Sequence, residues 1–441
     1  MFGVCIMNQR MKKLGFIFII ISLLLIPGLQ VLFIVGSHTK YLIRMPFFII
    51  IIVLLSILVL LLIAGIILFV HNIEATKKKL KTWKKVLFSI FMSFYIIGCV
   101  GFIVLLYGPN EKFKTWLITT AMQTMNHQYY CKWFYSSEDI EDVINNNYVE
   151  ESGESTDTSL IEKHEYKYKK DSYENDYEKQ ILDVEDDIKY QIIELEVNGC
   201  NGYLAVIYDP SKVKLAVTQY LGTRGQYVTQ MAEANNALLG INAGGFSDPG
   251  HNSAGGTPTG ITISNGKLIT NGEYGTRNQG GGIIGFTNED VLVLLKNTTA
   301  EEALNMGVRD AVSWGPFLIV NGTPSFIKGN GGWGYAARSA IGQRADGIVL
   351  LLVIDSNATR TKGANMIDLT EIMQNYGAIN AANLDGGTSS VMVMPKGIAQ
   401  SKYNAACNDY RNDTYCAIND PIDGALEHKT RPIADAWVVV E

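Results

Sequence analysis

The sequence predicts an α+β fold, in which a compact mixed-sheet domain follows an N-terminal region of three transmembrane helices. Three observations support this. The first hundred or so residues are almost all apolar, the middle of the chain is strongly acidic, and 33 of the 42 glycines fall in the last 243 residues. We therefore expect a membrane anchor over residues 1–110, a tether over 111–190 and a folded ectodomain over 191–441.

Three apolar segments define the anchor. Each has at least 21 residues without a charged side chain, and they run from Leu14 to Val35, from Pro46 to Val70 and from Val86 to Leu106. About 20 such residues cross a bilayer. A cleaved signal peptide is the rival interpretation of the first segment, although no small-residue cleavage site follows it. Lysines crowd the second loop, which predicts a cytoplasmic N-terminus, a multi-pass cell-membrane protein and an extracytoplasmic C-terminal domain.

The tether is marked by its charge. Between Glu138 and Asp187 there are 18 acidic and 5 basic side chains, a net charge of −13 in a chain whose formal total is −6. Such a stretch buries too little apolar surface to offset the entropy of ordering, so we expect it to be largely disordered. An acidic ligand-binding arm is the alternative. Nucleic acid is not an expected partner, because no basic patch carries interleaved aromatic residues.

Four of the six cysteines follow the anchor. Cys407 and Cys416 flank a short polar loop and are the favoured disulfide pair in an oxidising exterior, although the sequence leaves free thiols open. The pairing of Cys131 and Cys200 also stays open. The chain has no CxxC pair, HExxH motif or histidine cluster, which gives a zinc site little support. No cofactor is expected with certainty, and a divalent cation beside the acidic residues remains open.

Alternating patterns and turn residues give the elements of the ectodomain. Strands are expected at Gln191–Val197, Gly202–Tyr208 and Lys214–Thr218, and helices at Tyr227–Leu239 and from Met366 to a C-cap at Gly377. Asn-Gly pairs at 265–266 and 321–322 predict hairpin turns between β-branched runs.

Each expected helix leads into a short apolar strand, a polar residue and a Gly-Gly pair. The two segments read "GINAGGFSDPG" (240–250) and "GAINAANLDGGTSS" (377–390). A Gly-Gly pair beside an acid often marks an unusual backbone angle or the close approach of a ligand. We expect the two strand ends to converge and to line one cleft.

Five ordered stretches carry a resemblance to a known family. They are "INAGGFSDPG", "TPTGITISNGKLI", "SWGPFLIVNG", "ARSAIGQRADGIVLLLVID" and "GAINAANLDGGTSSVMV". In this order they resemble the phosphodiester glycosidase family over about residues 191–441. The resemblance implies a compact α+β domain that cleaves the bond between a sugar and a phosphodiester, in cell-surface glycans or exopolysaccharide. It also implies that Asn242, Asp248, Arg338 and Asp385, with Gly386 and Gly387, surround the pocket.

The residue types fit this chemistry. Glycoside cleavage usually employs two carboxyl groups, and Asp385 is the first choice, with Asp248 as either a second carboxylate or a turn residue. Arg338 suits a bidentate contact with phosphate. Asn242 and the stretch 385–387 could also be ordinary turn residues, and Arg338 could form a structural salt bridge. The other candidate substrate-binding residues are Asn242, Gly244, Gly245, Gln343, Arg344, Gly386, Gly387, Thr388 and Ser389.

Two other functions remain open at this stage. A carbohydrate-binding or sensor protein of the cell surface would bind a phosphoglycan without turnover. A transporter accessory is the second alternative, but the three apolar segments contain no charged residue to mark a translocation path. Anchoring in the lipid bilayer is the simpler role for them.

Overall fold

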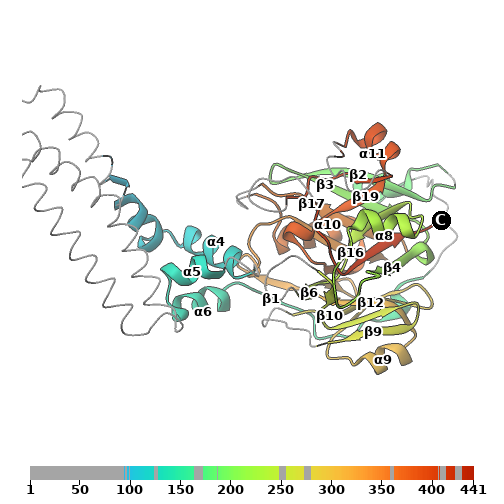
Figure 1. The fold of residues 1–441 in the computed structure, drawn as a ribbon, viewed down its shortest axis with the longest axis horizontal. Coiled ribbons are helices and arrows are strands. Elements are labelled where there is room, and N and C mark those ends of the chain that lie inside the picture. Colours follow the sequence, from blue (N-terminus) through green and yellow to red (C-terminus); the bar gives the residue numbers. More distant parts are fainter. Residues whose placement is uncertain are drawn as a thin grey trace, which may run out of the picture. The chain divides into compact units, whose positions relative to one another are not determined.

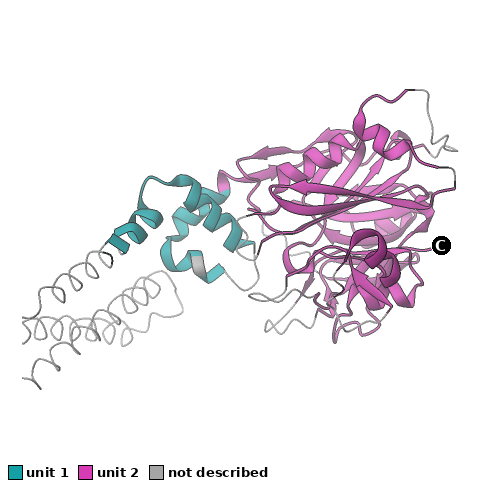
Figure 2. Cartoon of the chain, turned by 90° about the horizontal axis from the view of Figure 1, so that it is seen from above, with its two compact units in different colours: residues 1–144 teal, residues 145–441 magenta. Residues whose placement is uncertain are grey.

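The protein's structure is a computed structural model that divides into two compact units, residues 1–144 and 145–441 (Figure 2). It describes residues 94, 97–98, 100–123, 128–162, 172–185, 187–247, 255–272, 280–357, 362–405, 407, 414–422 and 430–441. The first two expected transmembrane segments lie outside these residues, and the third lies partly outside them. Within the described ranges, no helix combines the length and apolar composition that crossing a bilayer requires.

The described part of the first unit is helical. Residues 100–107 form a helix, and α4 (Glu111–Met122), α5 (Gln128–Phe134) and α6 (Ser137–Asn145) follow. These elements share an apolar core that includes Leu106, Ile118 and Cys131. The hydroxyl of Tyr135 donates to the carbonyl of Leu106 at 3.0 Å. The start of the expected tether is therefore folded.

A seven-stranded antiparallel sheet is the largest element of the second unit (Figure 1). Its order is β14 (Thr323–Pro324), β13 (Phe317–Val320), β18 (Ala378–Asn383), β16 (Arg338–Arg344), β17 (Val349–Ile354), β3 (Cys200–Ile207) and β2 (Tyr190–Val197). Along β17, Val349, Leu351 and Val353 pack into one apolar cluster and the alternate residues pack into another. This sheet is therefore buried on both faces.

Two five-stranded sheets complete the architecture. One has the order β20 (Tyr415–Ala417), β19 (Met392–Pro395), β5 (Leu239–Asn242), β21 (Asp435–Val439) and β4 (Val213–Val217), and α8 (Val228–Ala234) packs against it. The other has the order β11 (Leu292–Leu295), β10 (Gly282–Thr287), β12 (Val308–Trp314), β8 (Ile261–Ser264) and β9 (Lys267–Asn271). The side chains of Ile241, Phe286 and Ile341, one from each large sheet, belong to a single core cluster.

Shorter elements connect and cover these sheets. They are η2 (Pro210–Lys212), α9 (Ala300–Asn305), α10 (Met366–Asn375), η3 (Gly387–Ser389), α11 (Lys396–Tyr403) and the pair β6 (Phe246–Ser247) and β7 (Thr257–Pro258). Both expected hairpins are confirmed. Asn265 and Gly266 join β8 to β9, and Asn321 and Gly322 join β13 to β14, all four with positive φ. The first expected helix is shorter than its pattern indicated: α8 ends at Ala234 rather than at Leu239.

The segment 145–162, which we call the strap, is the first part of the second unit and pairs with one of its later strands. It contains β1 (Tyr148–Glu150), which pairs antiparallel with β15 (Phe326–Lys328), and η1 (Thr158–Leu160). The hydroxyl of Thr156 both donates to and accepts from the backbone of Leu294, at 3.1 and 2.8 Å. Helix α7 (Asp176–Leu182) follows, and Ile181 and Leu182 are buried in a core cluster.

The strap explains why the structure differs from the disordered tether that the charge pattern led us to expect. Glu151 is buried, and its Oε1 accepts hydrogen bonds from the backbone N–H groups of Gly281 at 2.5 Å and Phe317 at 2.7 Å. Its Oε2 lies 2.8 Å from the Lys296 ammonium. The net charge of a segment does not reveal such distant hydrogen-bond donors. In the structure the compact unit begins at residue 145, whereas the sequence led us to expect a start at 191.

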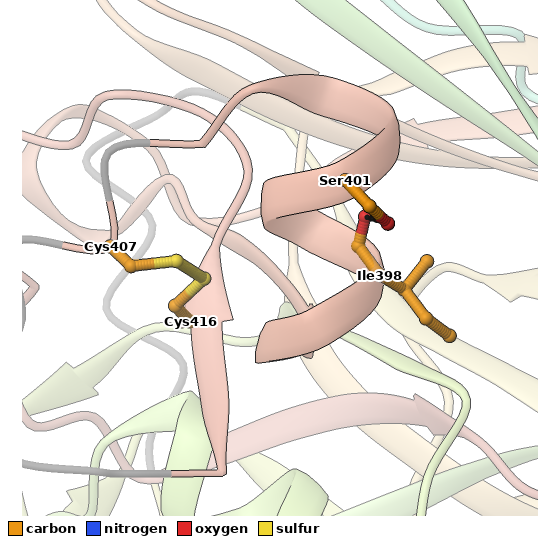
Figure 3. Close-up of a disulfide and its surroundings, with 4 residues drawn as sticks. All are labelled: Ile398, Ser401, Cys407 and Cys416. Atoms are coloured by element: carbon orange, nitrogen blue, oxygen red, sulfur yellow. Dashed lines mark hydrogen bonds between the residues drawn. A yellow bond between two sulfur atoms is a disulfide. The ribbon is translucent and has the colours of Figure 1, made fainter.

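The structure joins Cys407 and Cys416, the pair that the sequence favours, by a disulfide with a Cα–Cα distance of 5.2 Å. Figure 3 shows this bond beside α11, the helix that carries Ile398 and Ser401. Cys131 and Cys200 are free thiols.

Candidate active site

The two Gly-Gly segments meet where β5 and β18 end. The backbone N–H of Asp385 donates to the carbonyl of Ala243 at 3.0 Å, and the Asn242 amide donates to the carbonyl of Asp385 at 2.6 Å. The expectation that these strand ends converge is therefore confirmed. It places the Asp385 carboxylate at the junction of two large sheets.

Asn242 is fully buried and is engaged by the protein itself. Its Oδ1 accepts from the hydroxyl of Ser339 at 2.7 Å and from the backbone N–H of Val391 at 3.1 Å. Both acceptor sites of the amide oxygen are thus used. In this structure Asn242 ties three chain segments together behind Asp385, instead of presenting its amide to a sugar.

Gly244 and Gly245 allow close packing. A Cβ added to Gly245 would lie 1.8 Å from the Trp314 ring, and one added to Gly244 would lie 2.9 Å from Cβ of Val312. No side chain fits at either position. Their bareness is therefore explained by neighbouring protein atoms, and we assign them no contact with substrate.

Asp385 keeps part of its surface accessible to solvent. Its Oδ1 accepts from the backbone N–H of Gly386 at 3.0 Å. Burial raises the pKa of this carboxyl, while a hydrogen bond from Ser389 and the positive charges of Arg431 and Arg338 lower it. A carboxyl group whose pKa is raised by burial and lowered by two nearby guanidinium charges is typical of a functional site.

Arg431 is a site residue that the sequence did not suggest. Its Nη1 donates to the hydroxyl of Thr388 at 2.9 Å, and its guanidinium lies 4.8 Å from the centre of the Phe246 ring. It precedes the last strand, β21, in an Arg-Pro pair that has no recognisable motif. Thr388, a predicted site residue, is thus brought into the site together with an unpredicted arginine.

Arg338 lies at the start of β16 and is buried. Its Nε donates to the carbonyl of Ala364 at 3.2 Å, and its Nη2 donates to the carbonyls of Trp333 and Gly334. The expected bidentate contact with phosphate would have to replace these bonds. Arg338 instead contributes positive charge next to Asp385.

The Gly386–Gly387 pair, like Gly244 and Gly245, lies close to other protein atoms. The N–H of Gly387 donates to the carbonyl of Ala337 at 2.7 Å, and its φ of 65° is one that side chains rarely adopt. A Cβ on Gly386 would lie 3.4 Å from Nη1 of Arg338. The N–H groups of both glycines are therefore used within the protein, that of Gly386 by Asp385 and that of Gly387 by Ala337.

Asp435, at the start of β21, is the second residue that sequence reasoning missed. It is buried, and its Oδ1 accepts from the N–H of Gly244 at 2.7 Å. Its Oδ2 is buried and has no hydrogen-bond partner among the described residues. The pKa of Asp435 is raised to about 7, chiefly by burial; the bond from Gly244 lowers it and the charge of Asp385 raises it.

One peptide group connects the two acids. The carbonyl of the Ala243–Gly244 peptide accepts from the backbone of Asp385, and the N–H of the same peptide donates to the Asp435 side chain. The charge of the Asp385 carboxylate also raises the pKa of Asp435.

Gln343 and Arg344 lie at the far end of β16, about 20 Å along the strand from Arg338. The Gln343 amide donates to the carbonyls of Asp290 and Gly347 and accepts from the N–H of Leu292. Arg344 pairs with Asp346 at 2.9 Å and donates to the carbonyl of Tyr376. The structure does not bring either residue to the site.

Asp248, the other predicted carboxylate, lies outside the described residues. Within the described ranges, no three His, Cys, Asp or Glu side chains cluster as a metal site would require. Asp355, at the end of β17, accepts from the Asn419 amide at 2.8 Å, and burial raises its pKa to about 6.

Part of the chain is similar to known proteins. Residues 235–440 match the model of the phosphodiester glycosidase family, which confirms the resemblance carried by the five motifs. A curated relative, the SPbeta prophage-derived uncharacterized protein YomE of Bacillus subtilis (strain 168), is 26% identical over 198 residues. That match covers 42% of this chain and 28% of YomE, so the chain spans less than a third of its relative.

Two solved structures are also similar. The catalytic domain of zebrafish N-acetylglucosamine-1-phosphodiester alpha-N-acetylglucosaminidase, auto-inhibited by its pro-peptide, has 20% identity and a TM-score of 0.43, and the match covers 57% of this chain and 82% of that one. A putative exported protein of Burkholderia pseudomallei K96243 has 17% identity and a TM-score of 0.35, over 55% of this chain and 74% of that one. No residue role is transferred from either structure.

Proposed function

We propose, on the premise that residues 235–440 form a domain of the phosphodiester glycosidase family, that this protein hydrolyses the bond between a sugar and a phosphodiester. One observation of the structure carries the proposal. Asp385, a residue of intermediate exposure, lies at the junction of two sheets, where the guanidinium groups of Arg431 and Arg338 both act on its carboxyl group.

The reaction places distinct demands on the site. The oxygen of water becomes attached to the anomeric carbon, and the bond from that carbon to the phosphate oxygen breaks. The electron pair of this bond leaves with the phosphate monoester, so negative charge grows on the phosphate while positive charge grows on the sugar ring. A site for this step needs a carboxylate near the ring and cations near the phosphate.

The residues divide between these two roles. Asp385 faces the sugar, where its negative charge stabilises the oxocarbenium-like ring. Arg431, which the Thr388 hydroxyl holds at 2.9 Å, faces the phosphate. Asp435 is buried and does not touch the substrate. It is a positioning residue that fixes Gly244 and, through its coupling to Asp385, influences when that carboxyl is ionised.

The substrate is a glycan of the cell surface or an exopolysaccharide, and the enzyme meets it from the outer face of the cell membrane. Three apolar segments of at least 21 residues and the lysine-rich loop before the third support this orientation. The Cys407–Cys416 disulfide supports it independently, because such bonds persist in oxidising compartments.

The test uses the full chain purified in detergent and N-acetylglucosamine 1-phosphate methyl diester as the first of a panel of sugar-1-phosphodiesters. Released sugar and released methyl phosphate are measured with and without a chelator. We expect both products in equal amounts, and we expect Arg431→Gln to lose far more activity on the diesters than on a neutral methyl glycoside.

Two outcomes would overturn the proposal. Binding of the diesters without release of sugar would make the protein a carbohydrate-binding sensor. Release of methanol rather than sugar would show that the phosphorus–oxygen bond is the one cleaved. Loss of activity with chelator would add a divalent cation to the site.

A further inference from the structure

Aromatic side chains are concentrated around the end of the third apolar segment. Nine of the 34 residues 102–135 are Phe, Trp or Tyr, whereas these three types make up 10% of the whole chain. Trp and Tyr are enriched where a transmembrane segment leaves the bilayer, because their rings are apolar and their N–H and O–H groups are polar. The hydrolysis proposed above does not use this stretch.

The helix that leads into this stretch exposes apolar side chains around most of its circumference. Leu106 is the only buried residue of helix 100–107. The four consecutive residues 102–105 follow one another at about 100° around the helix axis, and each is between 39% and 58% exposed. A helix that is apolar all round is typical of a protein core or a membrane span. Because protein atoms cover so little of this helix, hydrocarbon is the surrounding that fits it.

Helices α4 and α5 lie side by side, close to the end of the apolar segment (Figure 1). Leu106 belongs to the same apolar cluster as Ile118 of α4 and Cys131 of α5. The hydroxyl of Tyr135 donates to the carbonyl of Leu106 at 3.0 Å. The headgroup layer beyond the hydrocarbon is about 5–8 Å thick, which is close to the radius of one helix with its side chains, about 5–6 Å. Two helices beside Leu106 therefore reach this layer.

Three aromatic residues of these helices lie outside their shared core. The cluster does not include Trp116, Tyr129 or Trp133, and Tyr129 is 38% exposed. Tyr129 and Trp133 are one turn apart on α5 and so share a face of the helix, with ring centres 4.7 Å apart. Helix α5 has one basic residue, Lys132, and no acidic one. The acidic stretch of the chain begins after this helix, at Glu138.

We infer that α4 and α5 lie in the headgroup layer of the outer leaflet, where Trp116, Tyr129 and Trp133 contact phospholipid. The inference rests on the membrane anchor proposed above but not on the proposed hydrolysis. Aromatic rings rather than charges make the contact, so zwitterionic phosphatidylcholine is a sufficient partner. Such a contact fixes the depth at which the third span ends.

The test uses the full chain in phosphatidylcholine vesicles, with and without bromine atoms on the acyl chains near the headgroup. Bromine quenches the fluorescence of tryptophans that touch the lipid. The chain has six tryptophans, at positions 83, 116, 133, 314, 333 and 437. Trp116→Phe and Trp133→Phe should each remove about a third of the quenched emission, because Trp83, just before the third segment, would share the opposite interface.

Trp333→Phe is the matched control, because Trp333 is half-buried like Trp116 and Trp133 but belongs to the second unit. It should lower the total emission and leave the quenched part unchanged. An unchanged quenched part in both Trp116→Phe and Trp133→Phe would overturn the inference, and it is the result expected if a second copy of the chain covers these rings.

The role of charge is tested with the same signal. The quenched part should be equal in brominated phosphatidylcholine and brominated phosphatidylglycerol. It should also persist from about 0.1 to 1 M salt, over which the Debye length falls from roughly 10 to 3 Å. Quenching that requires the anionic lipid and disappears at high salt would overturn the inference, because it would assign the contact to the exposed Lys112 and Lys132.

A last comparison separates this inference from the proposals on which the function depends. Extraction of the chain from the vesicles by alkaline carbonate would remove the membrane anchor and the inference with it. A chain that resists carbonate but lacks the Trp116 and Trp133 signals would keep the anchor and overturn the inference. A chain that resists carbonate and shows both signals, yet hydrolyses no diester, would support the inference and contradict the proposed hydrolysis.

Discussion

The strap and the active site each contain a buried acid, and the two acids differ in the partners that surround them. Glu151 of the strap receives two backbone N–H groups and the Lys296 ammonium. Asp435 of the site receives one N–H, from Gly244, and its second oxygen is buried without a partner among the described residues. Burial of a carboxyl group is common to both, whereas the neighbouring charge differs: the Lys296 ammonium lies beside Glu151, and the Asp385 carboxylate acts on Asp435.

This difference separates an acid that contributes to the stability of the fold from one whose pKa is shifted in the site. A buried acid with all its partners is already satisfied, and its removal leaves the donors around it unpaired. An acid that lacks partners retains affinity for a proton. The pKa of Asp435, raised to about 7 chiefly by burial, is the consequence.

The largest expected effect is kinetic and is confined to the site. Asp385→Asn keeps the size of the side chain and removes its charge, so we expect kcat/KM for a sugar-1-phosphodiester to fall by roughly 10²- to 10⁴-fold, the range for a catalytic acid or base. Glu151→Gln should leave kcat/KM within about twofold, because the strap touches no site residue described above. Near-normal turnover by a folded Asp385→Asn protein would remove the catalytic assignment.

The second effect is on stability, and here the substitution at Glu151 is the one expected to matter. Glu151→Gln keeps an acceptor for Gly281 and Phe317 but loses the ion pair with Lys296. We expect the free energy of unfolding of the second unit to fall by about 1–3 kcal/mol, measured as a shift in urea midpoint. A midpoint equal to that of wild type would mean that the strap is held without this acid.

The third effect depends on pH. The folded-state pKa of Asp435, about 7, lies above its ordinary value of 3.8, so the folded state binds the proton more tightly. The stability from this carboxyl is present below about pH 4 and is lost as pH rises to about 7. Asp435→Asn resembles the protonated form, so its urea midpoint should gain on that of wild type between pH 4.5 and 7.5. A constant difference across this range would contradict the raised pKa.

The smallest effect is expected at the far end of β16. Arg344→Lys loses part of the contact with Asp346 and Tyr376, which should cost about 0.5–1.5 kcal/mol of stability. Kinetic constants should not change, because about 20 Å of strand separates it from Arg338. A selective loss of activity on phosphodiesters would return Arg344 to the site.

Local chemistry explains which parts of the fold were predictable. The hairpins at Asn265–Gly266 and Asn321–Gly322 follow from the preference of Asn and Gly for positive φ, and both formed as expected. Convergence of the two Gly-Gly segments followed from their shared pattern of helix, strand and polar residue. The hairpins depend on a few adjacent residues, so the sequence contains them directly, whereas the convergence joins positions 143 residues apart and was inferred from the shared pattern.

The rest depends on distant partners. The stretch "ARSAIGQRADG" contains three of the expected site residues, Arg338, Gln343 and Arg344, but its arginines lie at opposite ends of an extended strand. Asp435 lies in an apolar strand, and the described donor to its side chain, the N–H of Gly244, is 191 positions earlier in the chain. Arg431 acquires its role only when the last strand brings it next to Thr388.

The strap also sets an order of events during synthesis. Glu151 emerges from the ribosome 130 residues before Gly281 and 166 residues before Phe317, its two backbone donors. At about 5–20 residues per second, the nascent strap waits on the order of 10–30 seconds before these N–H groups exist. During that interval the acidic side chains of the strap are hydrated and repel one another. This repulsion keeps the segment extended until the residues that it contacts have been synthesised.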